Sequence, residues 1–149
     1  MIDYDTLDTI ADSVNPILAT IALLGIGLTA SRKRWSKAIK LTFTFLLAAV
    51  VAYGWKFIDL KLKIWHFAGL DYSTHTAVTL VLCVLLSFTF QRVIYLWCGV
   101  FIAYVGLMLY QEYHSIADII STSLVISFTL YLFYSLYRAC VKKDKDHNH

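Results

Sequence analysis

Five apolar stretches joined by short polar connections constrain this chain more strongly than any other feature of its sequence. A helix that crosses a membrane needs roughly 20 largely apolar residues, because the hydrocarbon core is about 30 Å thick. Hydrophobic residues make up 59% of the 149-residue chain and charged residues only 15%, too few to cover a soluble domain. The stretches run approximately over Asn15–Ala30, Leu41–Phe57, Thr76–Phe90, Val93–Tyr110 and Ile119–Tyr137. The sequence therefore predicts an all-α fold, a polytopic membrane helix bundle of about five transmembrane helices.

The chain is expected to form a single membrane domain over residues 1–149, since it has one proline, Pro16, and no segment rich in serine and glycine. Within this domain we expect an outer interfacial segment at 1–14, the helix bundle at 15–137 and a cytoplasmic tail at 138–149. The apolar residues of 1–14 suit a helix lying in the membrane interface. The end of the tail, Asp144–His149, is polar and predicts disorder.

Basic residues are concentrated in the connections that five spans place on one side of the membrane. They are Arg32, Lys33, Arg34, Lys37 and Lys40 after the first stretch, Arg92 after the third, and Arg138, Lys142, Lys143 and Lys145 after the fifth. The positive-inside rule assigns that side to the cytoplasm, together with the C-terminus. The acidic N-terminus and the connections Lys56–His75 and Gln111–Asp118 then face outward. The compactness of the chain favours a bacterial inner membrane, whose outer face borders the periplasm.

Three lysines of the outer connections, Lys56, Lys61 and Lys63, run against this charge trend. Charges placed against the insertion bias often have a function. The alternative is that these lysines are anchors whose charged ends reach the headgroup region.

Two histidines stand at the outer ends of different spans. His75 lies where the third span begins, and His114 leads into the fifth. If residues 114–118 are helical, His114 and Asp118 share a helix face at i and i+4 spacing. A carboxylate in that place accepts a proton from one imidazole nitrogen and leaves the other free to attack a substrate.

The order of these residues resembles the type 2 phosphatidic-acid phosphatase family, membrane enzymes that hydrolyse lipid phosphates. Its motifs are Lys-x6-Arg-Pro, Pro-Ser-Gly-His and Ser-Arg-x5-His-x3-Asp. Here Lys56 to Lys63 stands for the first, Tyr72–His75 for the second, and His114–Asp118 supplies the end of the third. The resemblance covers roughly Leu41–Leu132, and the family normally carries one more span.

The resemblance implies a phosphatase or phosphotransferase that acts at the outer membrane face through a phosphohistidine. His114 would be the nucleophile, Asp118 would orient it, and His75 would be the general acid. The phosphate would be held by Lys56, Lys63, Ser73 and Thr74. Neither a metal nor another cofactor is implied. The expected partners are a lipid phosphate substrate and the membrane lipids, and nothing in the sequence suggests nucleic-acid recognition.

The chain departs from the family at the positions that clamp phosphate. Met108 stands where the third motif has arginine, Thr74 replaces the glycine of the second motif, and no proline follows Lys63. Arginine holds a phosphate through two parallel hydrogen bonds, whereas lysine is a point charge. These departures motivate a second hypothesis, a catalytically degenerate relative that binds a phospholipid headgroup or a membrane partner.

Two further interpretations stay open at this point. Asp71 and His75 also have i, i+4 spacing, so that they and the pair His114 and Asp118 offer a two-histidine, two-carboxylate zinc site. The remaining interpretation is that the histidines merely cap helices at the membrane interface.

Overall fold

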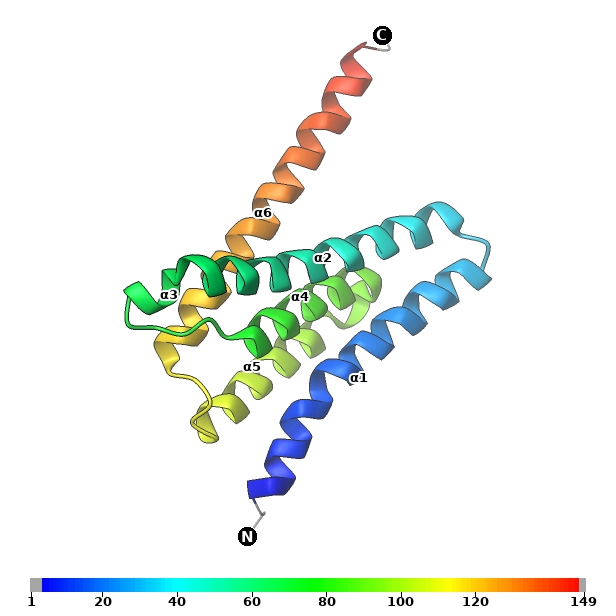
Figure 1. Cartoon of the computed structure of the whole chain (residues 1–149). Coiled ribbons are helices and arrows are strands. Elements are labelled where there is room, and N and C mark those ends of the chain that lie inside the picture. The colour runs from blue at the N-terminus through cyan, green and yellow to red at the C-terminus, as the bar shows by residue number, and fades with distance from the viewer. Residues whose placement is uncertain (1–3, 148–149) are drawn as a thin grey trace.

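A computed structural model describes residues 4–147 of the chain, with side chains from Asp5 to Leu136 and at Arg138. The elements are α1 (Tyr4–Ser31), α2 (Trp35–Leu62), α3 (Ile64–Phe67), α4 (Thr74–Thr89), the 3-10 turn η1 (Gln91–Val93), α5 (Ile94–Tyr110) and α6 (Ile116–His147). No strand occurs in this range, and the predicted all-α bundle is confirmed (Figure 1).

Four of the helices in the described range are long and apolar enough to cross a membrane. They cover Asp5–Ser31, Trp35–Leu62, Gln91–Tyr110 and Ile116–Leu136. Their outward faces carry large apolar side chains such as Phe43, Ile102 and Leu124, which are 66% to 69% exposed. Such a surface is stable against lipid and not against water. The chain is therefore an integral membrane protein.

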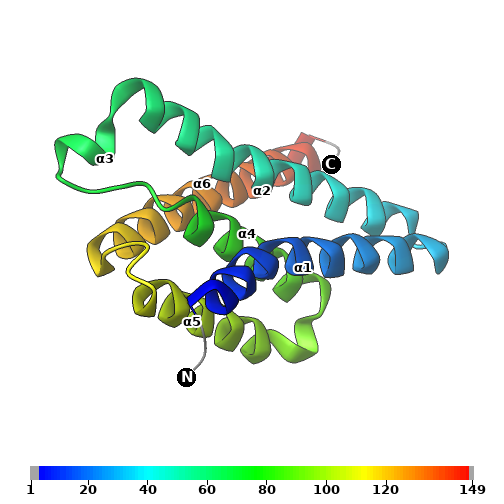
Figure 2. The same ribbon diagram turned by 60° about the horizontal axis from the view of Figure 1, so that its bottom comes forward.

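The remaining apolar helix, α4, is short and lies at the centre of the bundle. Its 16 residues span about 24 Å, less than the hydrocarbon thickness of about 30 Å. It contacts α1, α2, α5 and α6, and both ribbon views show it enclosed by them (Figures 1 and 2). Tyr72 and Ser73, just before it, are also buried. The first residues of α4 are thus recessed inside the bundle.

The close approach of α1 to the far end of α4 depends on one glycine. A Cβ atom added at Gly25 would lie 2.9 Å from Cγ2 of Thr89 and 3.1 Å from Cζ of Phe90, closer than packed carbon atoms come. Two residues further along α1, on nearly the opposite face, a Cβ at Gly27 would meet nothing within 4 Å. Small residues of this kind let membrane helices pack backbone to backbone.

Both ends of the bundle differ from the sequence-based expectation. The predicted interfacial segment 1–14 is not a separate helix, because α1 runs without a break from Tyr4 to Ser31. Asp5 in the first turn favours that start, since an acidic side chain complements the positive end of the helix dipole. The tail expected to be irregular is helical to His147, and residues 1–3 and 148–149 lie outside the described range.

Candidate functional site

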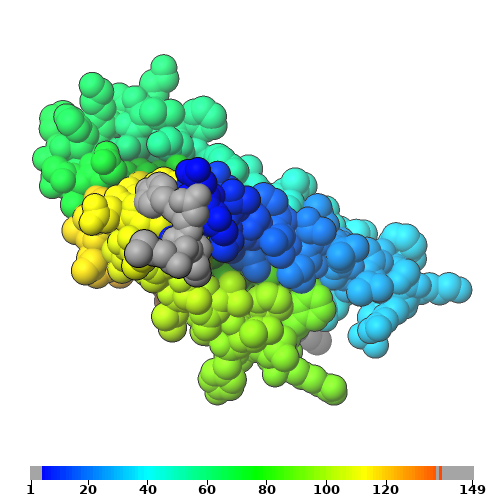
Figure 3. Space-filling view, turned by 90° about the horizontal axis from the view of Figure 1, so that it is seen from below, coloured from blue at the N-terminus to red at the C-terminus, as the bar shows by residue number. Residues whose placement is uncertain are grey.

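The candidate site forms where α2, α4 and α6 meet the connections 68–73 and 111–115, at the end of the bundle that also holds the start of α1. Seen from below, the first turns of α1 lie beside the α5–α6 connection (Figure 3). Buried Ala11, Tyr104, Met108 and Ile119 join these elements in one apolar cluster. We call this end of the molecule the histidine end, because it carries His75 and His114.

Asp118 joins two of these elements through its carboxylate. One oxygen, Oδ1, accepts a hydrogen bond from the backbone N–H of Asp71 at 2.7 Å. The other, Oδ2, accepts from the backbone N–H of Ser115 at 2.9 Å and from its hydroxyl at 2.7 Å. The Ser115 hydroxyl in turn accepts from the N–H of Asp118 at 3.2 Å. This reciprocal pair is a capping box that begins α6.

The predicted helical pairing of His114 with Asp118 is therefore wrong. Helix α6 begins at Ile116, so His114 lies in the turn before it and not one helical turn from Asp118. Among the described residues, Asp118 hydrogen-bonds backbone groups and Ser115, and not the His114 ring. The carboxylate acts on His114 only through its charge.

His114 nevertheless sits among the charged groups that the sequence singled out. Partial burial lowers the pKa of its imidazole below the usual value of 6.5, and the charges of His75 and Lys56 lower it further. The carboxylates of Asp118 and Asp71 oppose that shift. A histidine with a lowered pKa is neutral at pH 7 and keeps a free electron pair on one ring nitrogen.

His75 is half-buried in the first turn of α4, at the side of α5. Its Nδ1 lies 3.2 Å from the hydroxyl oxygen of Tyr104, and its ring is stacked on Tyr113 with a centroid distance of 6.4 Å. Helix α4 begins here because Ser73 is its N-cap and accepts a hydrogen bond from the N–H of Thr76. The two histidines thus enter the site from α4 and from the α5–α6 turn.

The four residues predicted to hold the phosphate differ in their burial and position. Ser73 is fully buried: its hydroxyl lies 2.7 Å from that of Thr76, and its N–H donates to Thr122. Thr74, the first residue of α4, is half-buried. Lys63 is exposed and ends α2 in the left-handed conformation, with φ 51°. Of these four, only Lys56 has a charge that His114 senses.

Met108, which replaces the expected arginine, is a core residue. It is 1% exposed and packs with Ala11, Tyr104 and Ile119. An arginine would place a charge in this apolar cluster, so the position is built for a neutral side chain.

The zinc hypothesis is not supported by the arrangement of its four residues. Asp71 precedes α4, which begins at Thr74, so it does not share a helix face with His75. Both Asp118 oxygens already accept hydrogen bonds. No three His, Cys, Asp or Glu side chains in the described part of the chain converge as a metal site would require.

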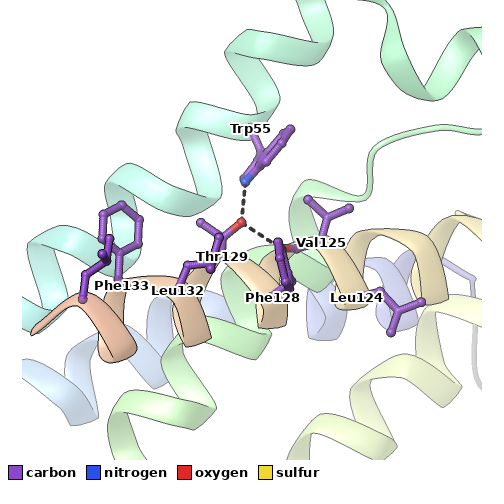
Figure 4. Close-up of a pocket in the computed structure, with 8 residues that line it drawn as sticks. Trp55, Leu124, Val125, Phe128, Thr129, Leu132 and Phe133 are labelled. Atoms are coloured by element: carbon purple, nitrogen blue, oxygen red, sulfur yellow. Dashed lines mark hydrogen bonds between the residues drawn. The ribbon is translucent and has the colours of Figure 1, made fainter. Parts of the chain in front are cut away.

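An apolar groove of about 600 Å³ lies between α2 and α6, close to Lys56 in the sequence. Figure 4 shows Trp55 reaching from α2 toward Thr129 on α6, where its indole N–H donates a hydrogen bond at 3.0 Å. The groove continues along α6 past Phe128 and Phe133. Trp55 also contacts the edge of Trp65, which donates a hydrogen bond to Ser121 and packs edge-on against Tyr72.

Sequence reasoning missed two partners at the histidine end. Tyr104 lies inside an apolar stretch, and its hydroxyl was the only sign of a polar role, because a buried tyrosine usually hydrogen-bonds. The Ser115-Ile116-Ala117-Asp118 capping box was readable as the sequence pattern Ser-x-x-acid before an apolar run.

No protein-family model, curated protein or solved structure matches this chain.

Proposed function

We propose that this protein is a membrane phosphatase or phosphotransferase that acts on a lipid phosphate, with His114 as the nucleophile. The observation that carries the proposal is the electrostatic environment of His114, which includes His75 and Lys56 from two other helices. A neutral imidazole supplies the attacking electron pair, and the neighbouring cation attracts the phosphate. The family resemblance of the sequence assigns the same roles to His114 and His75.

The proposed reaction has two steps. A ring nitrogen of His114 forms a bond to phosphorus while the bond from phosphorus to the lipid oxygen breaks, and that oxygen takes a proton from His75. Water then attacks phosphorus, gives its proton back to His75, and the nitrogen–phosphorus bond breaks to release phosphate. Positioning and charge stabilisation are the main contributions that a protein makes to phosphoryl transfer.

Lys56 is the cation that we assign to the phosphate. Its charge acts on His114, whereas Lys63 lies exposed at the end of α2. With Met108 in place of the arginine, the transition state lacks a bidentate partner. We therefore expect slow turnover compared with an enzyme that has the full set of cations.

A lipid is a better candidate substrate than a soluble phosphate ester. The histidine end lies at the ends of membrane-spanning helices, where a headgroup reaches it from the side. The apolar groove is lined by Trp55, the residue before Lys56 on α2. We propose that one anionic lipid places its phosphate at Lys56 and a hydrocarbon chain in the groove.

The charge distribution favours one orientation of the molecule. Arg32, Lys33 and Arg34 lie in the α1–α2 connection and Arg92 in η1, both at the end of the bundle opposite His75 and His114. By the positive-inside rule we place these at the cytoplasm and the histidine end outside. In a bacterial inner membrane, which we favour, the site faces the periplasm.

A second candidate function is binding of a phospholipid headgroup without chemistry. It is favoured by one specific observation: Asp118 and Ser73, which the family motif makes part of the site, are used here to cap and join helices. On this alternative His114 and Lys56 bind the headgroup and no phosphoryl bond breaks.

The test is phosphate release by purified protein reconstituted in lipid vesicles. The panel contains phosphatidic acid, phosphatidylglycerophosphate, an undecaprenyl diphosphate and a lipid A phosphate, each assayed with and without EDTA. We expect release from at least one substrate, a loss of about 100-fold or more in His114→Ala, and no change in His66→Ala. His66 is the matched control because it is exposed on α3 and absent from the environment of His114.

Three results would contradict the phosphatase. Equal phosphate release by His114→Ala and wild type would show that His114 is not the nucleophile. Loss of phosphate release with EDTA would indicate that the reaction needs a metal. The third result is that folded protein binds phosphatidic acid vesicles, that this binding depends on Lys56, and that no phosphate is released. It would establish the headgroup-binding alternative.

A further inference from the structure

A buried hydrogen-bonded chain connects three helices behind His75. Nδ1 of His75 on α4 lies 3.2 Å from the hydroxyl oxygen of Tyr104 on α5. That hydroxyl lies 3.3 Å from the backbone carbonyl oxygen of Ala11 on α1 and donates to it. Tyr104 is 3% exposed and Ala11 is 1% exposed, so the contact between them is closed to bulk water.

The protons in this chain can be placed by counting donors and acceptors. A carbonyl oxygen only accepts, and a phenol has one proton to give. Because the Tyr104 proton goes to Ala11, the Tyr104 oxygen is left as an acceptor. Both contacts are hydrogen bonds at once only if Nδ1 of His75 carries a proton and donates it to Tyr104. A neutral His75 then has its electron pair on Nε2.

Burial makes this arrangement difficult to replace. If Nδ1 were unprotonated, Tyr104 would have to turn its proton to His75 and give up the hydrogen bond to Ala11. The Ala11 carbonyl would keep only its hydrogen bond within α1, so the group as a whole would hold one buried hydrogen bond fewer. Thr79 also hydrogen-bonds the Tyr104 side chain. Its own proton points to the His75 carbonyl oxygen at 2.8 Å or to Asn15 Oδ1 at 2.7 Å, so Thr79 can offer Tyr104 only an acceptor.

We propose that Tyr104 is a positioning residue that holds His75 in the tautomer with the proton on Nδ1. A catalytic effect of this tautomer rests on the proposed function. When protonated His75 gives up a proton to the departing lipid oxygen, the proton leaves from Nε2, and the neutral ring that remains is already the tautomer that Tyr104 binds. Tyr113, stacked on the ring with an angle of 27° between the planes, fixes the ring from its other side. Helix α1 thereby takes part in the site through the Ala11 carbonyl.

The test is the nitrogen chemical shifts of His75 in detergent-solubilised, full-length protein labelled with ¹⁵N-histidine. His75 is assigned by comparison with His75→Gln, at about pH 8, where an ordinary imidazole is neutral. We expect wild-type Nδ1 to be protonated and Nε2 to be the unprotonated nitrogen. The wild-type spectrum is decisive by itself: an Nε2-protonated His75 would overturn the proposal even if a variant failed to fold.

Tyr104→Phe removes the acceptor and is the matched variant. We expect the His75 population to shift toward protonation on Nε2, while Tyr110→Phe, exposed at the end of the same helix, leaves it unchanged. An unchanged His75 tautomer in folded Tyr104→Phe would contradict the positioning role, because loss of packing alone does not move a proton between ring nitrogens.

Activity separates this inference from the proposed function. Where wild type releases phosphate, Tyr104→Phe should lower kcat by about 10- to 100-fold with little change in KM, as loss of an oriented general acid does. An unchanged kcat would overturn the positioning role. If wild type releases no phosphate but shows the Nδ1 tautomer, the phosphatase assignment fails and the Tyr104 inference stands.

Discussion

At the residue scale, the proposed attack on phosphorus requires that the His114 imidazole be neutral. Burial removes the imidazole from water and disfavours its charged form, and the neighbouring cations act in the same direction. The carboxylates of Asp118 and Asp71 act in the opposite direction but do not reverse the shift. His114 is thus a ring held neutral beside a cation that can attract phosphate.

This balance predicts the effect of neutralising one lysine. Lys56→Gln removes a charge that opposes protonation, so the pKa of His114 should rise toward 6.5. Since attack requires neutral His114, the acidic limb of the pH–rate profile should move to higher pH with it. Histidine NMR titration without substrate measures the shift directly. Lys61→Gln, an exposed lysine on the same helix, is the control, and an equal shift in both variants would refute the role of Lys56.

At the element scale, α4 determines how the site is built. It is the short central helix, and its recessed start places His75 beside Tyr104 of α5. The other end of α4 is positioned by contact with α1, where Gly25 leaves no space for a side chain. The packing at Gly25 therefore holds α1 against the end of α4, and the hydrogen bond from Tyr104 to Ala11 holds α1 against α5.

We predict that Gly25→Leu destabilises the protein by about 1–3 kcal/mol, because it overpacks the contact of α1 with Thr89 and Phe90. Gly27→Leu, in the same helix and facing open space, should change the stability by less than about 0.5 kcal/mol. Denaturant unfolding in detergent, followed by tryptophan fluorescence, compares the two. Equal stability of both variants would show that α1 does not pack on α4 as described.

Most of the helices could be predicted from the sequence, because a chain in lipid must satisfy its backbone hydrogen bonds within helices. Hydropathy marks where such a helix is apolar, but not where it ends. It therefore missed the acidic first turns of α1 and the helical extension of α6 to His147. Within the site, parity and charge predicted that His75, His114 and Lys56 lie on the same side, and the charges of His75 and Lys56 act on His114.

The roles that could not be predicted are those of side chains that cap the N-termini of α4 and α6. The sequence pattern that places Asp118 four residues after His114 is equally a capping box with Ser115, and only the helix start at Ile116 decides between them. In the same way, Ser73 fits both a phosphate-binding motif and a helix N-cap. Because Ser73 is fully buried and accepts a hydrogen bond from the N–H of Thr76, its role in the structure is that of the N-cap. The partner of His75 is distant in sequence, so spacing carried no signal for Tyr104.

At the scale of the whole molecule, the chain is a small membrane bundle whose two ends differ chemically. One end presents clustered cations in the α1–α2 connection, and the other brings together two histidines, a lysine and two carboxylates from separate elements. Between them lie exposed large apolar side chains and the apolar α2–α6 groove. This polarity is the basis for proposing chemistry on a headgroup at the histidine end.

Trapping the intermediate would show whether His114 forms a covalent bond to phosphorus. Protein in vesicles is mixed with ³²P-labelled lipid phosphate, stopped within seconds in alkali, and digested for mass spectrometry. We predict an acid-labile, alkali-stable phosphate on the peptide that contains His114. This phosphate should be absent from His114→Ala and retained in His66→Ala. Phosphate release in the panel without any such label, or a label on another residue, would contradict it.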